Sequence, residues 1–322
     1  MSIVIARSLV SGAELVGKDA AVYNCSGTQS NQMAIRAHCQ QGDEILIDET
    51  GHIVNYEAGA AAALSGVSAR CLRGRGGMLD VTDLEGMIRP GNQHSCITRL
   101  VCVENTTNHG GGRVWPLAQM VRVGEWAREH NLKVHVDGAR LFNAVVSGGY
   151  SPRDFVSHAD SVSICFSKGL GCPMGSILAG DADTIQRARR ARKVFGGALR
   201  QAGMMAASAI YALEHHVERL KVDHDNARAF ALAISGIEGI HVNLAEVESN
   251  LVFFEIDAGL GTSSQLSTQL TERGVRMYPF GQQRLRACTH LDVTTSDVLQ
   301  AADTIRECLA HGVRDSVASE QY

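Results

Sequence analysis

The sequence has few prolines, no linker and no excess of charge of either sign. It contains 5 Pro among 322 residues, and no Pro/Ser-rich stretch or internal repeat divides it. Lys and Arg total 30 and Asp and Glu total 34, a formal net charge of -4, which excludes the basic surface of a protein that binds nucleic acid or anionic membrane. No apolar run reaches the roughly 18 residues of a transmembrane helix. The first residues also lack the basic-then-apolar pattern of a secretory signal.

Hydrophobic residues are plentiful, at 45% of the chain, so a large core is expected and wholesale disorder is excluded. The length predicts two domains, or one large domain with an appendage. Gly accounts for 33 residues, about one in ten against a usual ~7%, which indicates tight turns where the backbone meets a ligand. These features favour an enzyme.

The 9 cysteines are scattered from Cys25 to Cys308 without the spacing of a zinc finger. They indicate a reducing, cytoplasmic compartment, in which most thiols are small buried core residues. The sequence predicts no metal site.

Short apolar runs alternate with longer amphipathic segments as far as about Leu213. In several runs both the odd and the even positions are apolar, as in strands that are covered on both faces. The predicted strands are 20–24, 44–48, 68–72, 98–104, 133–137, 161–166 and 175–179. The predicted helices include 29–40, 116–131 and 181–195. This alternation predicts an α/β fold with a mostly parallel sheet and helices on both of its faces.

The pattern changes after Leu213 and predicts a smaller C-terminal α+β domain. Helices are expected at 215–234, 264–273 and 295–310, and strands near 240 and at 251–257, 275–279 and 284–289. We therefore expect a large domain over residues 1–215 and a small one over 216–322.

Two candidate catalytic residues follow predicted strands. Asp137 ends one strand in VDGAR, and Lys168 follows another in FSKGLG. The carboxyl ends of parallel strands border the crevice where α/β sheets bind ligands. Taken singly, Asp137 could equally cap the next helix and Lys168 could lie in water at a loop mouth. Their separation of one strand–helix–strand unit lets both reach the same edge of the sheet.

A lysine and a carboxylate at one crevice are what pyridoxal 5'-phosphate requires. Burial favours the neutral amine that forms a Schiff base, and a carboxylate keeps the pyridine nitrogen of the cofactor protonated. Ser26, Gly27 and Thr28 open a predicted helix, whose free N–H groups and positive end suit a phosphate. Alone, this tripeptide could be only a helix cap.

His52 follows a further strand, where an imidazole could stack on a cofactor ring or move a proton. For one of 13 histidines, a core or surface position is the commoner outcome.

Seven sequence blocks carry a family resemblance. In order, they are SGTQSN, DETGHIVNYEAGA, ENTTN-GGGRV-PL, VHVDGARLFNA, DSVSICFSKGLG-P-GS, ARKVFGGALRQAG and RLRACTHLDV. From about Gly17 to Val293 the chain resembles the L-threonine aldolases, which are fold-type-I pyridoxal-phosphate lyases. The resemblance implies an aspartate aminotransferase-like fold with a seven-stranded large domain. It also implies a homodimer or homotetramer that acts on an amino-acid substrate.

The resemblance also implies roles for individual residues. Lys168 matches the Schiff-base lysine, Asp137 the partner of the pyridine nitrogen, and His52 the histidine that stacks on the ring. The phosphate loop of the family is matched by Ser26, Gly27 and Thr28.

Four further basic residues match positions near the cofactor or substrate. Arg140 matches an arginine near the phenolic oxygen of the cofactor and the substrate carboxylate. Arg286 matches the arginine that takes this carboxylate, as a planar guanidinium can do bidentately. Arg200 and Lys193 match basic residues near the phosphate.

Two departures from the family qualify these expectations. Thr107 stands where many members have histidine, which predicts relaxed discrimination between threonine and allo-threonine because a hydroxyl does not titrate near neutral pH. An N-terminal active-site segment of the family has no counterpart here, which predicts a weak aldolase or none.

The reaction implied is the retro-aldol cleavage of L-threonine or L-allo-threonine to glycine and acetaldehyde. Its base is either His52 or a bound water. The alternatives are a related lyase that performs β-elimination and a truncated, non-catalytic paralogue.

Overall fold

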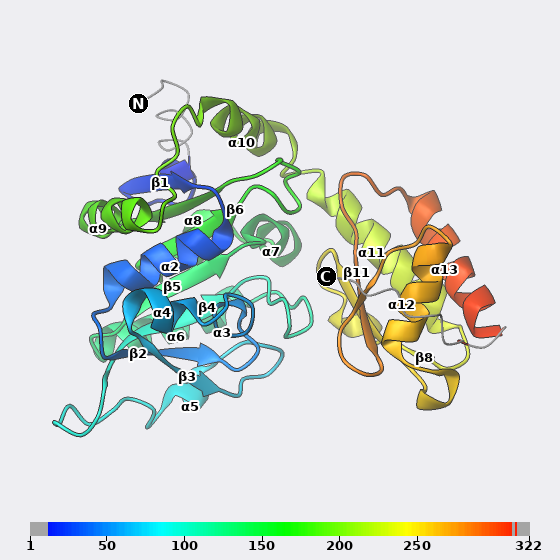
Figure 1. Ribbon diagram of the computed structural model, residues 1–322, viewed down its shortest axis with the longest axis horizontal. Coiled ribbons are helices and arrows are strands. Elements are labelled where there is room, and N and C mark those ends of the chain that lie inside the picture. Colours follow the sequence, from blue (N-terminus) through cyan, green and yellow to red (C-terminus); the bar gives the residue numbers. More distant parts are fainter. Residues whose placement is uncertain (1–11, 311–312, 314–322) are drawn as a thin grey trace. The chain divides into compact units, whose positions relative to one another are not determined.

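The computed structural model describes residues 12–310 and 313 of the chain (Figure 1). The chain divides into two compact units, Met1–Leu220 and Lys221–Tyr322, called here the N-terminal and C-terminal units. The expected boundary after residue 215 falls where helix α10 ends. Within the described residues, no helix is both long and apolar enough to cross a lipid bilayer.

A seven-stranded sheet forms the centre of the N-terminal unit, in the order β1-β7-β6-β5-β4-β2-β3. Its strands are β1 Ala20–Asn24, β2 Asp43–Asp48, β3 Ser68–Leu72, β4 Ile97–Glu104, β5 Lys133–Gly138, β6 Ser161–Cys165 and β7 Ser176–Gly180. The neighbouring strands β3, β2, β4, β5 and β6 pair in parallel. Strand β7 pairs antiparallel with both β6 and β1. The predicted mostly parallel sheet is confirmed.

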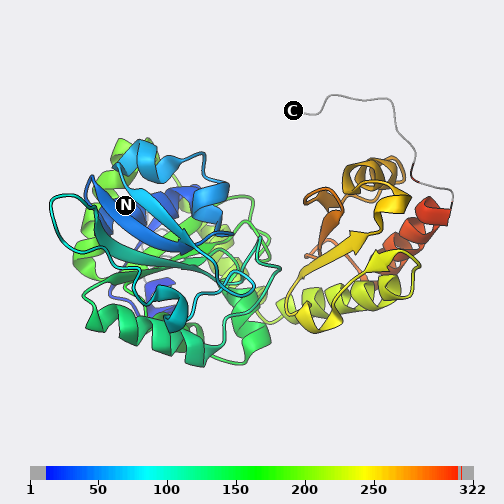
Figure 2. The ribbon, with the colours of Figure 1, turned by 90° about the horizontal axis from the view of Figure 1, so that it is seen from below.

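Helices cover both faces of this sheet (Figures 1 and 2). The helices of the unit are α2 Gly27–His38, α3 His52–Asn55, α4 Ala60–Ser65, α5 Val81–Leu84, α6 Leu117–Glu129, α7 Leu141–Gly148, α8 Pro152–Val156, α9 Ala182–Val194 and α10 Gly203–His215. Helices α2 and α9 pack together on one face, and α6 and α8 pack together on the other.

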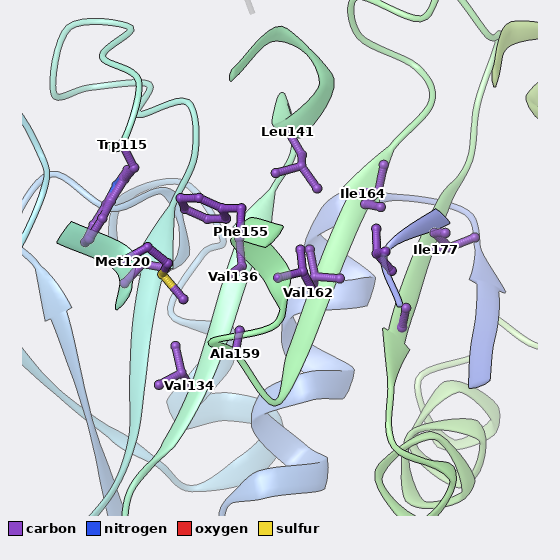
Figure 3. Close-up of a cluster of buried hydrophobic side chains, with 14 of the residues drawn as sticks. Trp115, Met120, Val134, Val136, Leu141, Phe155, Ala159, Val162, Ile164 and Ile177 are labelled. Carbon is purple, nitrogen blue, oxygen red and sulfur yellow. The ribbon is translucent and has the colours of Figure 1, made fainter. Parts of the chain in front are cut away.

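The face covered by α6 and α8 is apolar. Val134 and Val136 of β5 and Val162 and Ile164 of β6 alternate toward it. They meet side chains such as Phe155 of α8 (Figure 3). This period-2 pattern buries one side of each strand in the main core.

The face of β5 and β6 toward α2 carries polar residues instead. His135, Asp137, Ser161 and Ser163 occupy the alternate positions of the two strands and are buried. Because buried polar groups need partners, this layer must be hydrogen-bonded to α2. The site described below is built from it.

The C-terminal unit has a separate antiparallel sheet in the order β10-β11-β9-β8. Its strands are β8 Ile240–His241, β9 Leu251–Ile256, β10 Tyr278–Pro279 and β11 Arg284–Cys288. Its helices are α11 Leu220–Ser235, α12 Ser263–Glu272 and α13 Thr295–Ala310, with 3-10 turns at Leu244–Glu246 and Ala258–Leu260. One hydrophobic cluster, from Ala227 to Leu309, forms its core. The predicted small α+β fold is confirmed.

The helix expected at 215–234 is present as α11, but it begins at Leu220, five residues later than predicted. Residues 216–219 form a turn between α10 and α11. The imidazole Nδ1 of His216 lies 2.7 Å from the carbonyl oxygen of Leu170, a tertiary contact at the point where α10 ends.

Candidate active site

The predicted site residues of the N-terminal unit follow the carboxyl ends of neighbouring strands. Asp137 is the penultimate residue of β5, and Lys168 lies three residues beyond the end of β6. The loop after β2 leads to His52 at the start of α3, and Ser26 follows β1. The topology therefore brings these residues to one edge of the sheet, as the sequence predicts.

Asp137 is a buried carboxylate, 3% exposed. Its Oδ2 accepts a hydrogen bond from Asn31 Nδ2 at 2.7 Å, and its Oδ1 accepts one from the backbone N–H of Ala139 at 3.1 Å. Within the described part of the chain it forms no ion pair. A buried carboxylate without a cation is costly, so Asp137 is suited to a positively charged group of a ligand.

His52 is held by a second buried carboxylate. Its Nδ1 lies 3.0 Å from Oε1 of Glu57. This hydrogen bond raises the pKa of His52 above its usual value, with the charge of Asp137 acting in the same direction. Burial and the positive charge of Lys168 act in the opposite direction.

A third carboxyl group, that of Glu104 at the end of β4, is buried at the same edge of the sheet. Burial and then the negative charge of Asp137 raise the pKa of Glu104 to about 8. The protonated form of Glu104 is therefore favoured at neutral pH. A small cavity lies among His52, Glu104, Asp137 and Trp115.

The start of α2 packs closely on β6. Ser26 caps this helix, accepting a hydrogen bond from the backbone N–H of Gln29 at 3.2 Å. A Cβ built at Gly27 would lie 2.5 Å from Sγ of Cys165, so only glycine fits there without movement. Gly27 and Thr28 begin the helix and are partly exposed. The first turn therefore leaves free N–H groups at the edge where Lys168 lies.

Arg140 follows β5 and precedes α7. Its Nε is buried and has no hydrogen-bond partner among the described residues. Its positive charge lowers the pKa of Cys165, as that of Lys168 does, although burial dominates and raises it. Arg140 thus lies near the first turn of α2.

The other three basic residues stay predictions. Arg200 is exposed in the loop that follows α9, and Lys193 is exposed near the end of α9 itself. Arg286 lies on β11 of the C-terminal unit, where its guanidinium carbon is 5.3 Å from the ring centroid of Tyr278 and 5.9 Å from that of Phe280.

Thr107 is fully buried, and its hydroxyl has a structural partner. Oγ1 accepts the backbone N–H of Arg113 at 3.0 Å, and the N–H of Thr107 donates to the carbonyl of Arg113 at 2.9 Å. The effect of this position on diastereomer preference stays a prediction, and a histidine there would first have to fit a site with no free surface.

His52, Glu57 and Asp137 place oxygen and nitrogen atoms within 4.8 Å of one another, as a metal site does. However, Asn31 Nδ2 donates to both carboxylates, to Glu57 Oε1 at 2.8 Å and to Asp137 Oδ2 at 2.7 Å. An N–H donor between the two carboxylates replaces a cation in this position. We assign the cluster to hydrogen bonding.

Three buried polar residues of the site are not predicted from the sequence, namely Asn31, Glu57 and Glu104. Asn31 and Glu57 lie inside the blocks SGTQSN and DETGHIVNYEAGA, and Asn31 is four residues after Gly27, on the same face of α2. This helical spacing from the glycine is the signal that could have found Asn31.

Comparisons with known proteins agree on one family and one fold. Residues 6–257 match the family model described as beta-eliminating lyase. The chain is 37% identical over 299 residues to the low specificity L-threonine aldolase of Escherichia coli K12, covering 92% of this chain and 87% of that protein. It is also 37% identical over 291 residues to low-specificity L-threonine aldolase 1 of Arabidopsis thaliana, covering 89% and 81%.

Solved structures share the fold at lower identity. A threonine aldolase from Leishmania major superposes with a TM-score of 0.80 at 21% identity, over 94% of this chain and 89% of that chain. A serine palmitoyltransferase from Sphingomonas wittichii superposes with a TM-score of 0.75 at 18% identity, over 97% and 77%. The expected fold-type-I architecture is confirmed.

Proposed function

The chain belongs to the beta-eliminating lyase family, and from this membership we infer that it is a low-specificity threonine aldolase, a pyridoxal-phosphate-dependent lyase. It cleaves L-threonine and L-allo-threonine to glycine and acetaldehyde. The similarity to such aldolases extends over about nine tenths of the chain. Within the structure, the observation that supports it most is the buried Asp137, which has no cationic partner among the described residues and lies at the sheet edge that Lys168 follows.

The residues present fit pyridoxal 5'-phosphate. Among residues 12–310, Asp137 has no cationic partner, a charge that the protonated pyridine nitrogen would supply, and the buried Nε of Arg140 has no hydrogen-bond partner. At Gly27 the backbone is closely packed, and the first turn of α2 can accept a phosphate. We propose that Lys168 attaches the aldehyde of the cofactor, that Ser26, Gly27 and Thr28 hold its phosphate, and that Arg200 assists them.

When bound, this cofactor supplies an electron sink for the pair released as the Cα–Cβ bond of the substrate breaks. Asp137 would hold the proton on the ring nitrogen by its charge. Arg140 would orient the substrate carboxylate, and the same role for Arg286 stays a prediction from the resemblance. We propose that His52 covers the ring and that its Nε2 takes the β-hydroxyl proton, directly or through a water molecule.

Product analysis tests this function. The purified protein with pyridoxal 5'-phosphate should release glycine and acetaldehyde in equal amounts from L-threonine and from L-allo-threonine. Pyruvate and ammonia from a substrate with a leaving group at Cβ, without acetaldehyde from either threonine, would instead identify a β-eliminating lyase. If the cofactor-loaded protein releases neither set of products, a non-catalytic role is favoured.

We also propose a homodimer or homotetramer in the cytoplasm. The nine free cysteines suit a reducing compartment. Light scattering coupled to size-exclusion chromatography would measure the mass, and a monomer of 34.5 kDa would contradict the proposed assembly.

A further inference from the structure

Asn31 joins two carboxylates of the site through a single nitrogen atom. Its Nδ2 donates to Asp137 Oδ2 at 2.7 Å and to Glu57 Oε1 at 2.8 Å. The side chain is buried on α2, and so are both carboxylates, Asp137 on β5 and Glu57 in the turn between α3 and α4. An amide has two N–H donors, so both are used here, one for each carboxylate.

The rest of the buried network fixes the orientation of this amide. With both protons of Nδ2 committed, Oδ1 of Asn31 must accept, and it lies 2.7 Å from Oγ of Ser163 and 3.2 Å from Nε2 of His135. His135 therefore carries its proton on Nε2. Its Nδ1 then accepts from the hydroxyl of Ser161 at 2.9 Å. Each donor in this layer meets an acceptor, so rotating the Asn31 amide would break at least four bonds.

Glu57 is bound on three sides and has one orientation. Its Oε1 accepts from Asn31 and faces Nδ1 of His52 at 3.0 Å, and its Oε2 accepts from Gln32 Nε2 at 2.6 Å. An ionised carboxylate can only accept, so the proton between the two groups belongs to Nδ1 of His52. In neutral His52 the lone pair is then on Nε2, the nitrogen that can act on a ligand.

We propose that Glu57 and Asn31 are positioning residues for the reaction: Glu57 fixes the tautomer and orientation of His52, and Asn31 ties Glu57 to the carboxylate that serves the cofactor ring. This inference rests on the proposed function, in which His52 takes a proton and Asp137 faces the ring nitrogen. Glu57 plays no part in bond making. It acts through His52, as a carboxylate orients a histidine base in other enzymes.

The charges around His52 give the proposal a measurable signature. Glu57 and Asp137 favour the imidazolium, and Lys168 disfavours it. Glu104, which is mostly protonated near neutral pH, adds little charge. Replacing Glu57 by Gln removes the largest favourable contribution, so the pKa of His52 should fall. His52 then stays neutral to lower pH, and the acidic limb of the pH profile of kcat/KM should move to lower pH.

The first experiment measures the imidazole itself. Long-range proton–nitrogen NMR spectra of the holoenzyme, with the His52 signal identified by its absence in His52→Gln, report the tautomer and the pKa. In the wild type the neutral form should carry its proton on Nδ1. A neutral form protonated on Nε2 would overturn the proposal without the need for any other variant.

The second experiment compares variants of α2 and its partner. In Glu57→Gln, kcat should fall roughly 100-fold, the size of a general acid–base contribution, with KM changed less than threefold. Asn31→Ser, which can no longer bridge two carboxylates, should lower kcat in the same way. The matched control is Ser30→Ala, next to Asn31 in the sequence, which removes buried hydrogen bonds to Ser176 and Asn24. It should change neither the acidic limb nor kcat by more than about twofold.

Two outcomes would contradict the proposal. One is a Glu57→Gln enzyme whose acidic limb and His52 titration match the wild type. The other is an equal loss of kcat in Glu57→Gln and Ser30→Ala, since that indicates only damaged packing. Failure of the proposed function is distinguishable, because a wild type without acetaldehyde release would leave the NMR titration of His52 and its dependence on Glu57 fully measurable.

Discussion

Asp137 is the residue on which the proposed chemistry depends most, and Asp137→Asn isolates its charge. The amide keeps the size of the side chain but cannot hold a ring proton by charge, so the electron sink weakens. We expect cofactor binding to persist and kcat to fall roughly 100-fold, about 2.7 kcal/mol in the barrier. Cofactor absorbance and single-turnover rates would be measured on the same samples, and near-normal turnover would contradict this role.

The assignment of Lys168 as the residue that attaches the cofactor can be tested directly. After borohydride reduction, peptide mapping of the wild type should find the cofactor on Lys168, and Lys168→Ala should carry no adduct. Lys133→Ala is the matched control, since Lys133 begins β5 at the opposite end of the strand and pairs with Asp160 at 2.8 Å. Labelling of another lysine in the wild type would disprove the assignment.

Single residues also show where prediction from the sequence ends. Asp137 and Lys168 could be found because both lie at or just beyond the carboxyl end of an apolar strand, a position with known meaning in α/β folds. Asn31, Glu57 and Glu104 could not be found in this way. Their importance comes from burial and from partners distant in the chain, such as the contact of Asn31 with Asp137, 106 residues away.

At the scale of elements, the strands were predictable and one helix boundary was not. All seven predicted strands of the large sheet are present, with β1 and β3 at the predicted bounds, because apolar runs between turns define buried strands well. The antiparallel direction of β7 has no local signal. The break between α10 and α11 was missed because residues 211–220 contain neither Gly nor Pro, and the contact of His216 with Leu170 is tertiary.

The close packing of α2 on β6 implies that a side chain at Gly27 disturbs both stability and cofactor binding. In Gly27→Ala the new Cβ would meet Sγ of Cys165 at 2.5 Å, so the first turn of α2 must shift. We expect a loss of about 1–3 kcal/mol in the free energy of unfolding and weaker cofactor binding. Cofactor affinity by fluorescence titration and stability in urea would measure both effects.

A double variant provides the control for this prediction. Removing the sulfur in Gly27→Ala/Cys165→Ala should restore much of the affinity, because the two substitutions then couple through one contact. Gly91→Ala, where a Cβ meets nothing within 4 Å, should leave affinity unchanged. If the double variant binds no better than Gly27→Ala, the contact with Cys165 is not the cause.

At the scale of the whole molecule, the two units have separate cores. The hydrophobic cluster from Ala227 to Leu309 lies entirely within the C-terminal unit, and the clusters of the large sheet lie entirely within the N-terminal unit. Both Trp residues, Trp115 and Trp126, are buried in the N-terminal unit. Tryptophan fluorescence therefore follows the unfolding of that unit alone.

The pH dependence of this unfolding should reflect the polar layer beneath α2. Burial lowers the pKa of His135 to about 3 and that of His38 to about 4. Both values are below the ~6.5 of an unfolded histidine, so the unfolded chain binds more protons in acid. The neutral forms of these two histidines therefore contribute to the free energy of unfolding above about pH 6.5, and this contribution is lost as the pH falls toward 4. Glu104, with its pKa raised to about 8, contributes stability that is lost as the pH rises through 8.

We therefore expect the N-terminal unit of the cofactor-free protein to be most stable near pH 6.5. His135→Gln removes one buried imidazole, so the fall in the free energy of unfolding below that pH should be shallower by up to about 1.4 kcal/mol per pH unit. Urea titrations followed by tryptophan fluorescence at about pH 7, 6 and 5 would measure the slope. His94→Gln, at an exposed position, is the control that should keep the wild-type slope. Parallel slopes for His135→Gln and the wild type would show that His135 is not the group whose protonation opposes folding.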